Sequence, residues 1–144
     1  EYQARKHTLE EYAREIGMKL VIGGTYDLRP FIAAVAGDID GRCSYCYRVR
    51  MEATVRYAAE HGFDSFTTSL LISPYQNHGG IAAAAREMGE RYGVEFLYRD
   101  FRPLFQEGQQ FAREHGFYMQ KYCGCIFSEE DRYMGAKRKK KTEG

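Results

Sequence analysis

The sequence has no long apolar run. No stretch of it approaches the ~18 consecutive apolar residues that a membrane-spanning helix needs. Residues 1–17 are charged throughout and lack the apolar core of a secretory signal. With 44% hydrophobic and 28% charged residues, the composition is that of a globular chain with enough apolar side chains for one core. These features exclude a membrane protein and a disordered chain, and we expect a cytoplasmic protein.

The sequence also has little net charge, +1, but the charges are unevenly placed. Five of the 21 basic residues, and only one of the 20 acidic residues, lie in residues 135–144, so residues 1–134 carry a net charge of −3. A basic run attracts polyanions such as nucleic acids, although it is also typical of a solvated chain end. We expect residues 1–134 to form a single α/β domain and residues 135–144 to form a basic flexible tail.

Helical and strand patterns alternate along the chain. Helices are predicted at residues 1–16, after Asp27, and at residues 45–61, 81–92 and 109–115, and strands at residues 19–23, 64–69 and 94–98. Strands that alternate with helices of this length form a parallel sheet covered by helices, so we expect a Rossmann-like α/β fold. Three short strands make a thin sheet, and the sequence opens on a helix. A first strand is therefore expected to be missing from it, or to be replaced by a partner.

Cysteine is scarce, and the four cysteines form two close pairs, Cys43-x-x-Cys46 and Cys123-x-Cys125. Structural disulfides are rare in cytosolic proteins, so pairs this close indicate metal or redox chemistry. The first pair lies where a loop is expected to enter a helix, and this arrangement places both sulfur atoms on one side of the chain. It favours the thiolate form that soft metals and iron–sulfur clusters require.

The residues alone leave the chemistry of these pairs open. Structural zinc, an iron–sulfur site, a thiol redox pair and inert buried cysteines are all compatible with the spacing. The glycine between Cys123 and Cys125 permits a strained and easily reduced disulfide. This feature favours a two-electron redox pair at these two positions.

Polar residues are concentrated after the second predicted strand. Open parallel sheets bind ligands beyond the carboxyl ends of their strands, so Tyr75, Gln76 and His78 are candidate substrate-contacting or proton-donating residues. Gly79 and Gly80 begin a helix whose backbone amides can receive a phosphate. The same pattern also fits an ordinary strand-to-helix loop with capping residues.

Four further segments carry a more specific pattern. They are GRCSYCYR at residues 41–48, FTTSLLISPYQNH at 66–78, YRDFR at 98–102 and YMQKYCGCIFS at 118–128. Together they resemble the QueH family of tRNA epoxyqueuosine reductases over residues 26–128. The resemblance implies reduction of the epoxide of epoxyqueuosine to queuosine at the wobble position of tRNA. It also implies an α/β fold related to the adenine-nucleotide α-hydrolases (HUP-like).

The resemblance also implies roles for the cysteines. Cys43 and Cys46 match two ligands of a 4Fe-4S cluster whose other two ligands, an adjacent Cys-Cys pair on an N-terminal strand, are absent from this sequence. Cys123 and Cys125 match the redox-active pair of the family. Removal of an epoxide oxygen takes two electrons and two protons, which a dithiol can store, whereas a cluster usually passes one electron at a time.

The resemblance implies three further groups: tRNA carrying epoxyqueuosine, an electron donor of unknown identity and an additional iron ion. The iron ion would polarise the epoxide oxygen. Asp27 joins the polar residues after the second strand as a candidate substrate-contacting or proton-donating residue. A competing hypothesis is a zinc-stabilised nucleic-acid-binding module without catalysis, in which all four thiolates hold one metal ion and the lysine-rich tail contacts phosphates. A nucleotide-binding α/β fragment without activity is a third.

Overall fold

The computed structural model describes residues 1–24 and 27–142, with side chains as far as Gly135. Its internal contacts divide the chain into two compact units, one formed by residues 24–108 and the other by residues 1–23 and 109–144. None of the described helices is long and apolar enough to span a membrane. In the predicted tail, residues 135–144, no side chain after Gly135 is described. The flexibility of this tail stays a prediction.

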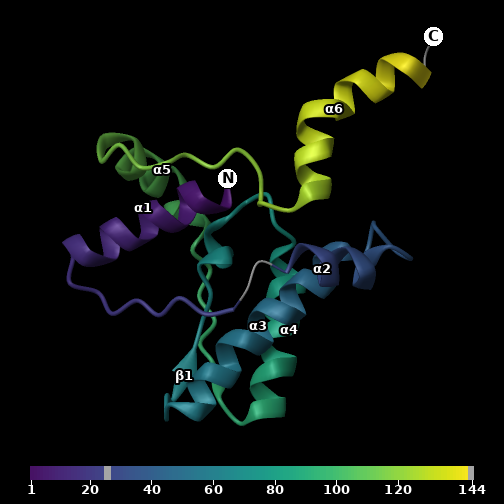
Figure 1. The fold of residues 1–144 in the computed structure, drawn as a ribbon. Coiled ribbons are helices and arrows are strands. Elements are labelled where there is room, and N and C mark those ends of the chain that lie inside the picture. The colour runs from purple at the N-terminus through teal and green to yellow at the C-terminus, as the bar shows by residue number, and fades with distance from the viewer. Residues whose placement is uncertain (25–26, 143–144) are drawn as a thin grey trace. The chain divides into compact units, whose positions relative to one another are not determined.

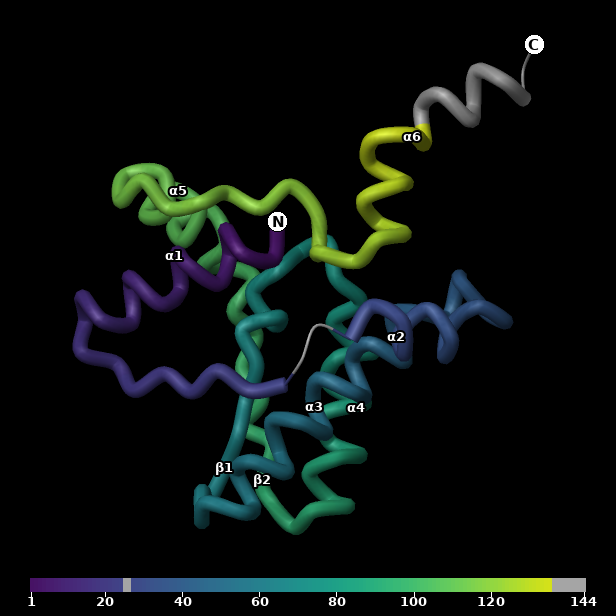
Figure 2. The backbone as a smooth tube through the Cα atoms, in the orientation of Figure 1, coloured from purple at the N-terminus to yellow at the C-terminus, as the bar shows by residue number. Residues whose placement is uncertain are grey.

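Residues 24–108 form an α/β unit (Figure 1). Its elements are α2 (Leu28–Val35), α3 (Arg42–Glu60), β1 (Ser65–Phe66), η1 (Ser69–Ile72, a 3₁₀-helix), α4 (His78–Tyr92), β2 (Glu95–Phe96), η2 (Arg102–Leu104) and the start of α5 (Phe105–Glu114). The two strands pair in parallel, with Ser65 opposite Glu95 and Phe66 opposite Phe96. α3 and α4 pack against each other, and each contacts one of the strands (Figure 2). The expected parallel sheet covered by helices is therefore present in a small form.

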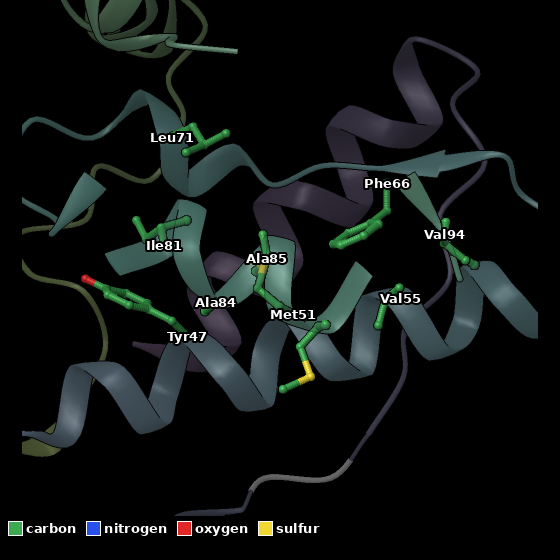
Figure 3. Close-up of a cluster of buried hydrophobic side chains, with 11 residues drawn as sticks. Tyr47, Met51, Val55, Phe66, Leu71, Ile81, Ala84, Ala85 and Val94 are labelled. Carbon is green, nitrogen blue, oxygen red and sulfur yellow. The ribbon is translucent and has the colours of Figure 1, made fainter. Parts of the chain in front are cut away.

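A hydrophobic core joins α3, α4 and the two strands (Figure 3). The apolar side chains of both helices recur every three or four residues, which places one buried stripe on each helix. The stripes consist of Tyr47, Met51, Val55 and Ala58 on α3, and Ile81, Ala84, Ala85 and Met88 on α4. Phe66, Leu71 and Val94 complete the core from the strands and the segments that flank them. This core sets the positions of the first turns of both helices.

Gly89 allows α4 to approach the sheet closely. A Cβ atom added at Gly89 would lie 2.7 Å from the Val94 carbonyl oxygen and 3.3 Å from Cε1 of Phe66. Although alanine favours helices more than glycine does, we expect Gly89→Ala to lower the free energy of unfolding by about 1–3 kcal/mol, because the backbone has to shift.

Gly79→Ala is the matched control for this prediction, since it is the same change in the same helix. The nearest atom to a Cβ at Gly79 is Oδ1 of Asn77, at 3.8 Å, which is ordinary contact. Urea unfolding should show this control to be as stable as the wild type or slightly more stable. Equal effects of the two substitutions would contradict the close approach.

The second unit is built from α1 (Tyr2–Glu15), the remainder of α5 and α6 (Ile126–Thr142). The rings of Tyr12, Phe111 and Phe117 pack edge to face, with centroids 4.9–6.0 Å apart, and this packing holds α1 against the end of α5. α1 ends as predicted, since Gly17 follows the helix with φ of +67°.

The strand predicted at residues 19–23 is wrong. The segment has no regular secondary structure, and Val21 and Ile22 are 50% and 46% exposed rather than buried. A strand requires a neighbour for its backbone hydrogen bonds, and the one strand pairing in the described residues joins β1 to β2. An apolar run indicates a tendency to be buried, but it does not supply that neighbour.

The other predicted elements are present with different bounds. Three helices begin three or four residues earlier than predicted, at Arg42, His78 and Phe105. For α4 the reason is a local cap, because Oδ1 of Asn77 accepts a hydrogen bond from the backbone N–H of Gly80 at 2.9 Å. The two other predicted strands are each only two residues long in the structure. The last residue of the strand predicted at residues 64–69 belongs instead to η1.

Candidate functional site

The first two turns of α3 carry the Cys-x-x-Cys pair. Because the helix begins at Arg42, Cys43 and Cys46 are both helical and lie on one face, three residues apart. Cys43 is exposed and Cys46 is partly buried. Two sulfur atoms so placed near the surface can ligate one metal ion or cluster together.

Tyr47 ties the polar loop after η1 to this helix. Its hydroxyl donates to Oε1 of Gln76 at 2.7 Å and accepts from the backbone N–H of Asn77 at 3.1 Å. Tyr47 directly follows Cys46, so the predicted loop is held against the turns of α3 that carry the cysteines. Tyr75, in contrast, is 86% exposed, and its ring packs edge to face with that of Phe105, at a centroid distance of 5.7 Å.

His78 begins α4 and faces Tyr98, which follows β2. Nε2 of His78 lies 2.8 Å from the Tyr98 hydroxyl, whereas its Nδ1 is buried without a hydrogen-bond partner. The Arg86 guanidinium lies 5.2 Å from the centroid of the Tyr98 ring. Unsatisfied buried polar atoms are rare in proteins, so Nδ1 of His78 is a candidate contact for a bound molecule. Sequence reasoning missed Tyr98 as a site residue, although its place at the end of a predicted strand is close to the signal that selected His78.

Asp100, further along the same segment, is paired with Arg102. Its carboxylate accepts hydrogen bonds from Nε at 2.8 Å, from Nη2 at 2.7 Å and from the backbone N–H of Arg102 at 3.1 Å. These bonds lower the pKa of Asp100 from 3.8 to about 2. A lowered pKa in the folded state means that the pair adds stability above the ordinary pKa and that this contribution disappears as the pH falls through the folded-state pKa.

We therefore expect the contribution of Asp100 to be complete above pH 3.8 and lost as the pH approaches 2. NMR titration of the Asp100 carboxyl carbon measures this directly. Arg102→Gln should return the pKa of Asp100 toward 3.8, because it removes the guanidinium donors. An unchanged titration in that variant would show that the ion pair is not the cause.

Asp27 lies immediately before α2 and is exposed. As predicted, a helix begins directly after it. Its assignment as a substrate-contacting residue stays a prediction.

The Cys-Gly-Cys pair lies in the other unit, in the irregular turn before α6. Cys123 and Cys125 are partly buried thiols without a disulfide bond between them. The Cys123 thiol donates to the hydroxyl oxygen of Ser128 at 3.2 Å. Gly124 has φ of +106°, a conformation that side-chain-bearing residues rarely adopt. The carbonyl of Cys125 accepts from the backbone N–H of Glu129 at 3.0 Å, so this turn leads directly into the helix.

The donor atoms for a metal are only partly assembled. Within residues 1–24 and 27–142, as far as side chains are described, no three His, Cys, Asp or Glu residues gather into a group that could hold a metal ion. Cys43 and Cys46 offer two sulfur ligands, whereas a tetrahedral zinc site or a 4Fe-4S cluster takes four. The α/β unit therefore fits half of such a donor set.

A small parallel sheet covered by helices, with polar residues beyond its strands, defines an α/β protein, and its chain also carries two close pairs of cysteines. A family model described as epoxyqueuosine reductase QueH matches residues 1–131. The chain thus belongs to the QueH family of epoxyqueuosine reductases, as its motifs predicted.

Two relatives illustrate the similarity. The chain is 33% identical over 133 residues to the epoxyqueuosine reductase QueH of Dehalococcoides mccartyi, an alignment that covers 92% of this chain and 73% of the relative. It is 34% identical over 137 residues to the epoxyqueuosine reductase QueH of Thermotoga maritima, with coverage of 89% and 71%. Both alignments span most of each protein.

Proposed function

We propose that this protein reduces the epoxide of epoxyqueuosine to queuosine at the wobble position of tRNA. The observation that carries the proposal is the family match over residues 1–131, which includes both cysteine pairs. In this reaction the epoxide oxygen leaves as water and the two carbon atoms that held it become a double bond. The reaction consumes two electrons and two protons.

Cys123 and Cys125 are the proposed source of these electrons. Oxidation of the two thiols to a disulfide releases two electrons and two protons, which balances the removal of one epoxide oxygen as water. Gly124 supports this role, because its positive φ allows the two cysteines to share one tight turn. A reduced dithiol or another two-electron donor must then restore the thiols.

Cys43 and Cys46 are the proposed protein ligands of a 4Fe-4S cluster, for which they supply two of the four sulfur atoms. The chemistry implied is single-electron transfer for the cluster and polarisation of the epoxide oxygen for an additional iron ion. The position of both cysteines on one face of the first two turns of α3 supports joint ligation.

The polar segments that follow β1 and β2 are the proposed substrate surface. His78, with one ring nitrogen at Tyr98 and the other unsatisfied, is suited to proton donation. The exposed ring of Tyr75 is suited to stacking on an RNA base. The side chain of Gln76 accepts a hydrogen bond from the Tyr47 hydroxyl. Its proposed role is therefore to hold the loop in place as well as to contact the substrate. Asp27 is retained as a further candidate contact.

The test is anaerobic turnover of tRNA that contains epoxyqueuosine, followed by mass spectrometry of the nucleosides. The chain is expressed with any residues that its gene encodes before Glu1 and is reconstituted with iron and sulfide. We expect queuosine to form, and we expect the Cys43→Ser, Cys46→Ser double variant to bind less iron. Colourless protein with one zinc ion held by all four cysteines, and no turnover, would instead support a nucleic-acid-binding module.

A further inference from the structure

Arg5 of α1 bonds to the backbone of the Cys-Gly-Cys turn. Its Nη1 donates to the Cys123 carbonyl oxygen at 2.9 Å, and its Nη2 donates to the Tyr122 carbonyl oxygen at 2.6 Å. The guanidinium also lies 5.4 Å from the centroid of the Tyr122 ring, within cation–π range. Three contacts from one rigid, planar group therefore hold the chain on the N-terminal side of the thiol pair.

Gly124 and Arg5 fit each other. A Cβ atom at position 124 would lie 2.9 Å from Nη1 of Arg5, in addition to the unfavourable φ of +106°. Arg5 is itself oriented by Glu1, whose carboxylate accepts from Nε at 2.7 Å. The guanidinium is thus held in place, and it occupies the space that a side chain between the cysteines would need.

Ser128 approaches the pair from its other side. It lies in the first turn of α6, whose start is set by the hydrogen bond between the Glu129 N–H and the Cys125 carbonyl. This geometry presents the Ser128 hydroxyl to the Cys123 sulfur at 3.2 Å, with the thiol as donor. Only the reduced form of Cys123 can make this bond as a donor, because a disulfide carries no S–H hydrogen.

We propose that Ser128 stabilises the dithiol form of the Cys123–Cys125 pair and so raises its reduction potential, and that Arg5 positions the turn for this contact. The inference rests on the proposed redox role of the pair. When the two thiols are oxidised, two electrons and two protons leave, and one of these protons is the S–H hydrogen that Cys123 donates to Ser128. A stabilised dithiol is regenerated more readily by a donor dithiol, which matters for an enzyme that must be recharged after every turnover.

Redox equilibration tests the proposal without any assay of activity. The protein is equilibrated with mixtures of reduced and oxidised glutathione, free thiols are alkylated, and the peptide that carries both cysteines is quantified by mass spectrometry. In Ser128→Ala the equilibrium constant for oxidation should rise about threefold, a fall of about 14 mV in potential for a two-electron couple. Ser128→Thr keeps the hydroxyl and should stay at the wild-type value.

Thr8→Val is the control, because it removes a hydroxyl whose bond is to the Ala4 carbonyl of its own helix. The role of Arg5 is tested by a double-mutant cycle. If Arg5 positions the turn, Ser128→Ala should change the potential less in an Arg5→Gln background than in the wild type.

Two outcomes separate this inference from the proposed function. A pair that cycles normally but has the same potential in Ser128→Ala as in the wild type overturns the role of Ser128 and leaves the redox function standing. A pair that forms no Cys123–Cys125 disulfide at any ratio of reduced to oxidised glutathione overturns both. Additive effects in the cycle overturn the positioning role of Arg5.

Discussion

Replacement of either Cys123 or Cys125 by serine should lower the rate of epoxyqueuosine reduction by about a thousandfold or more, the scale of loss seen when a group essential to the chemistry is removed. A single remaining thiol cannot form the intramolecular disulfide that releases both electrons. The rate is measured as queuosine formed per enzyme in single-turnover reactions.

The fold should survive both substitutions, since serine is close in size to cysteine and neither thiol belongs to the hydrophobic core. Cys125→Ser is the more informative variant, because it leaves the Cys123–Ser128 contact in place. Circular dichroism and the unfolding midpoint should match the wild type. A rate within a few-fold of the wild-type rate in either variant would show that the pair is not the reductant.

Ile81→Ala should lower the free energy of unfolding by about 2–5 kcal/mol. Ile81 is fully buried at the start of α4, in the core that also contains Tyr47 and Leu71. Truncation removes apolar contacts and leaves a cavity beneath the loop that Tyr47 holds. Urea denaturation followed by circular dichroism measures the change.

Tyr75→Ala is the contrasting variant, because that side chain is 86% exposed. Its unfolding free energy should change by less than about 0.5 kcal/mol, as is usual for surface substitutions. If Tyr75 stacks on an RNA base, Tyr75→Ala should also bind the tRNA more weakly than the wild type does. Loss of stability in Tyr75→Ala comparable with that of Ile81→Ala would contradict the burial pattern.

The two cysteine pairs lie in different compact units. Cys43 and Cys46 belong to residues 24–108, whose core packs α3 and α4 on the sheet, and Cys123 and Cys125 belong to the unit formed by the two ends of the chain. The first pair lies on a regular helix, which suits ligation by fixed sulfur atoms, and the second lies in a glycine turn, which suits formation and breakage of a disulfide. This difference in local structure parallels the difference in proposed role.

By itself, the sequence determined the features that depend on near neighbours in the chain. Apolar spacing predicted α1, α3 and α4, and the short motifs around the cysteines identified the family. Helices and their caps are local because each backbone hydrogen bond joins residues four apart, so the information lies within a few positions. Helix α6, in contrast, was not predicted from the sequence.

Tertiary structure alone decided which distant residues meet. The run at residues 19–23 has the composition of a strand but lacks a paired neighbour, so composition predicted it wrongly. The contact of Arg5 with Cys123 spans 118 residues of sequence, and that of His78 with Tyr98 spans 20. Strand pairing and contacts of this kind depend on how separate elements pack, which spacing along the chain does not encode.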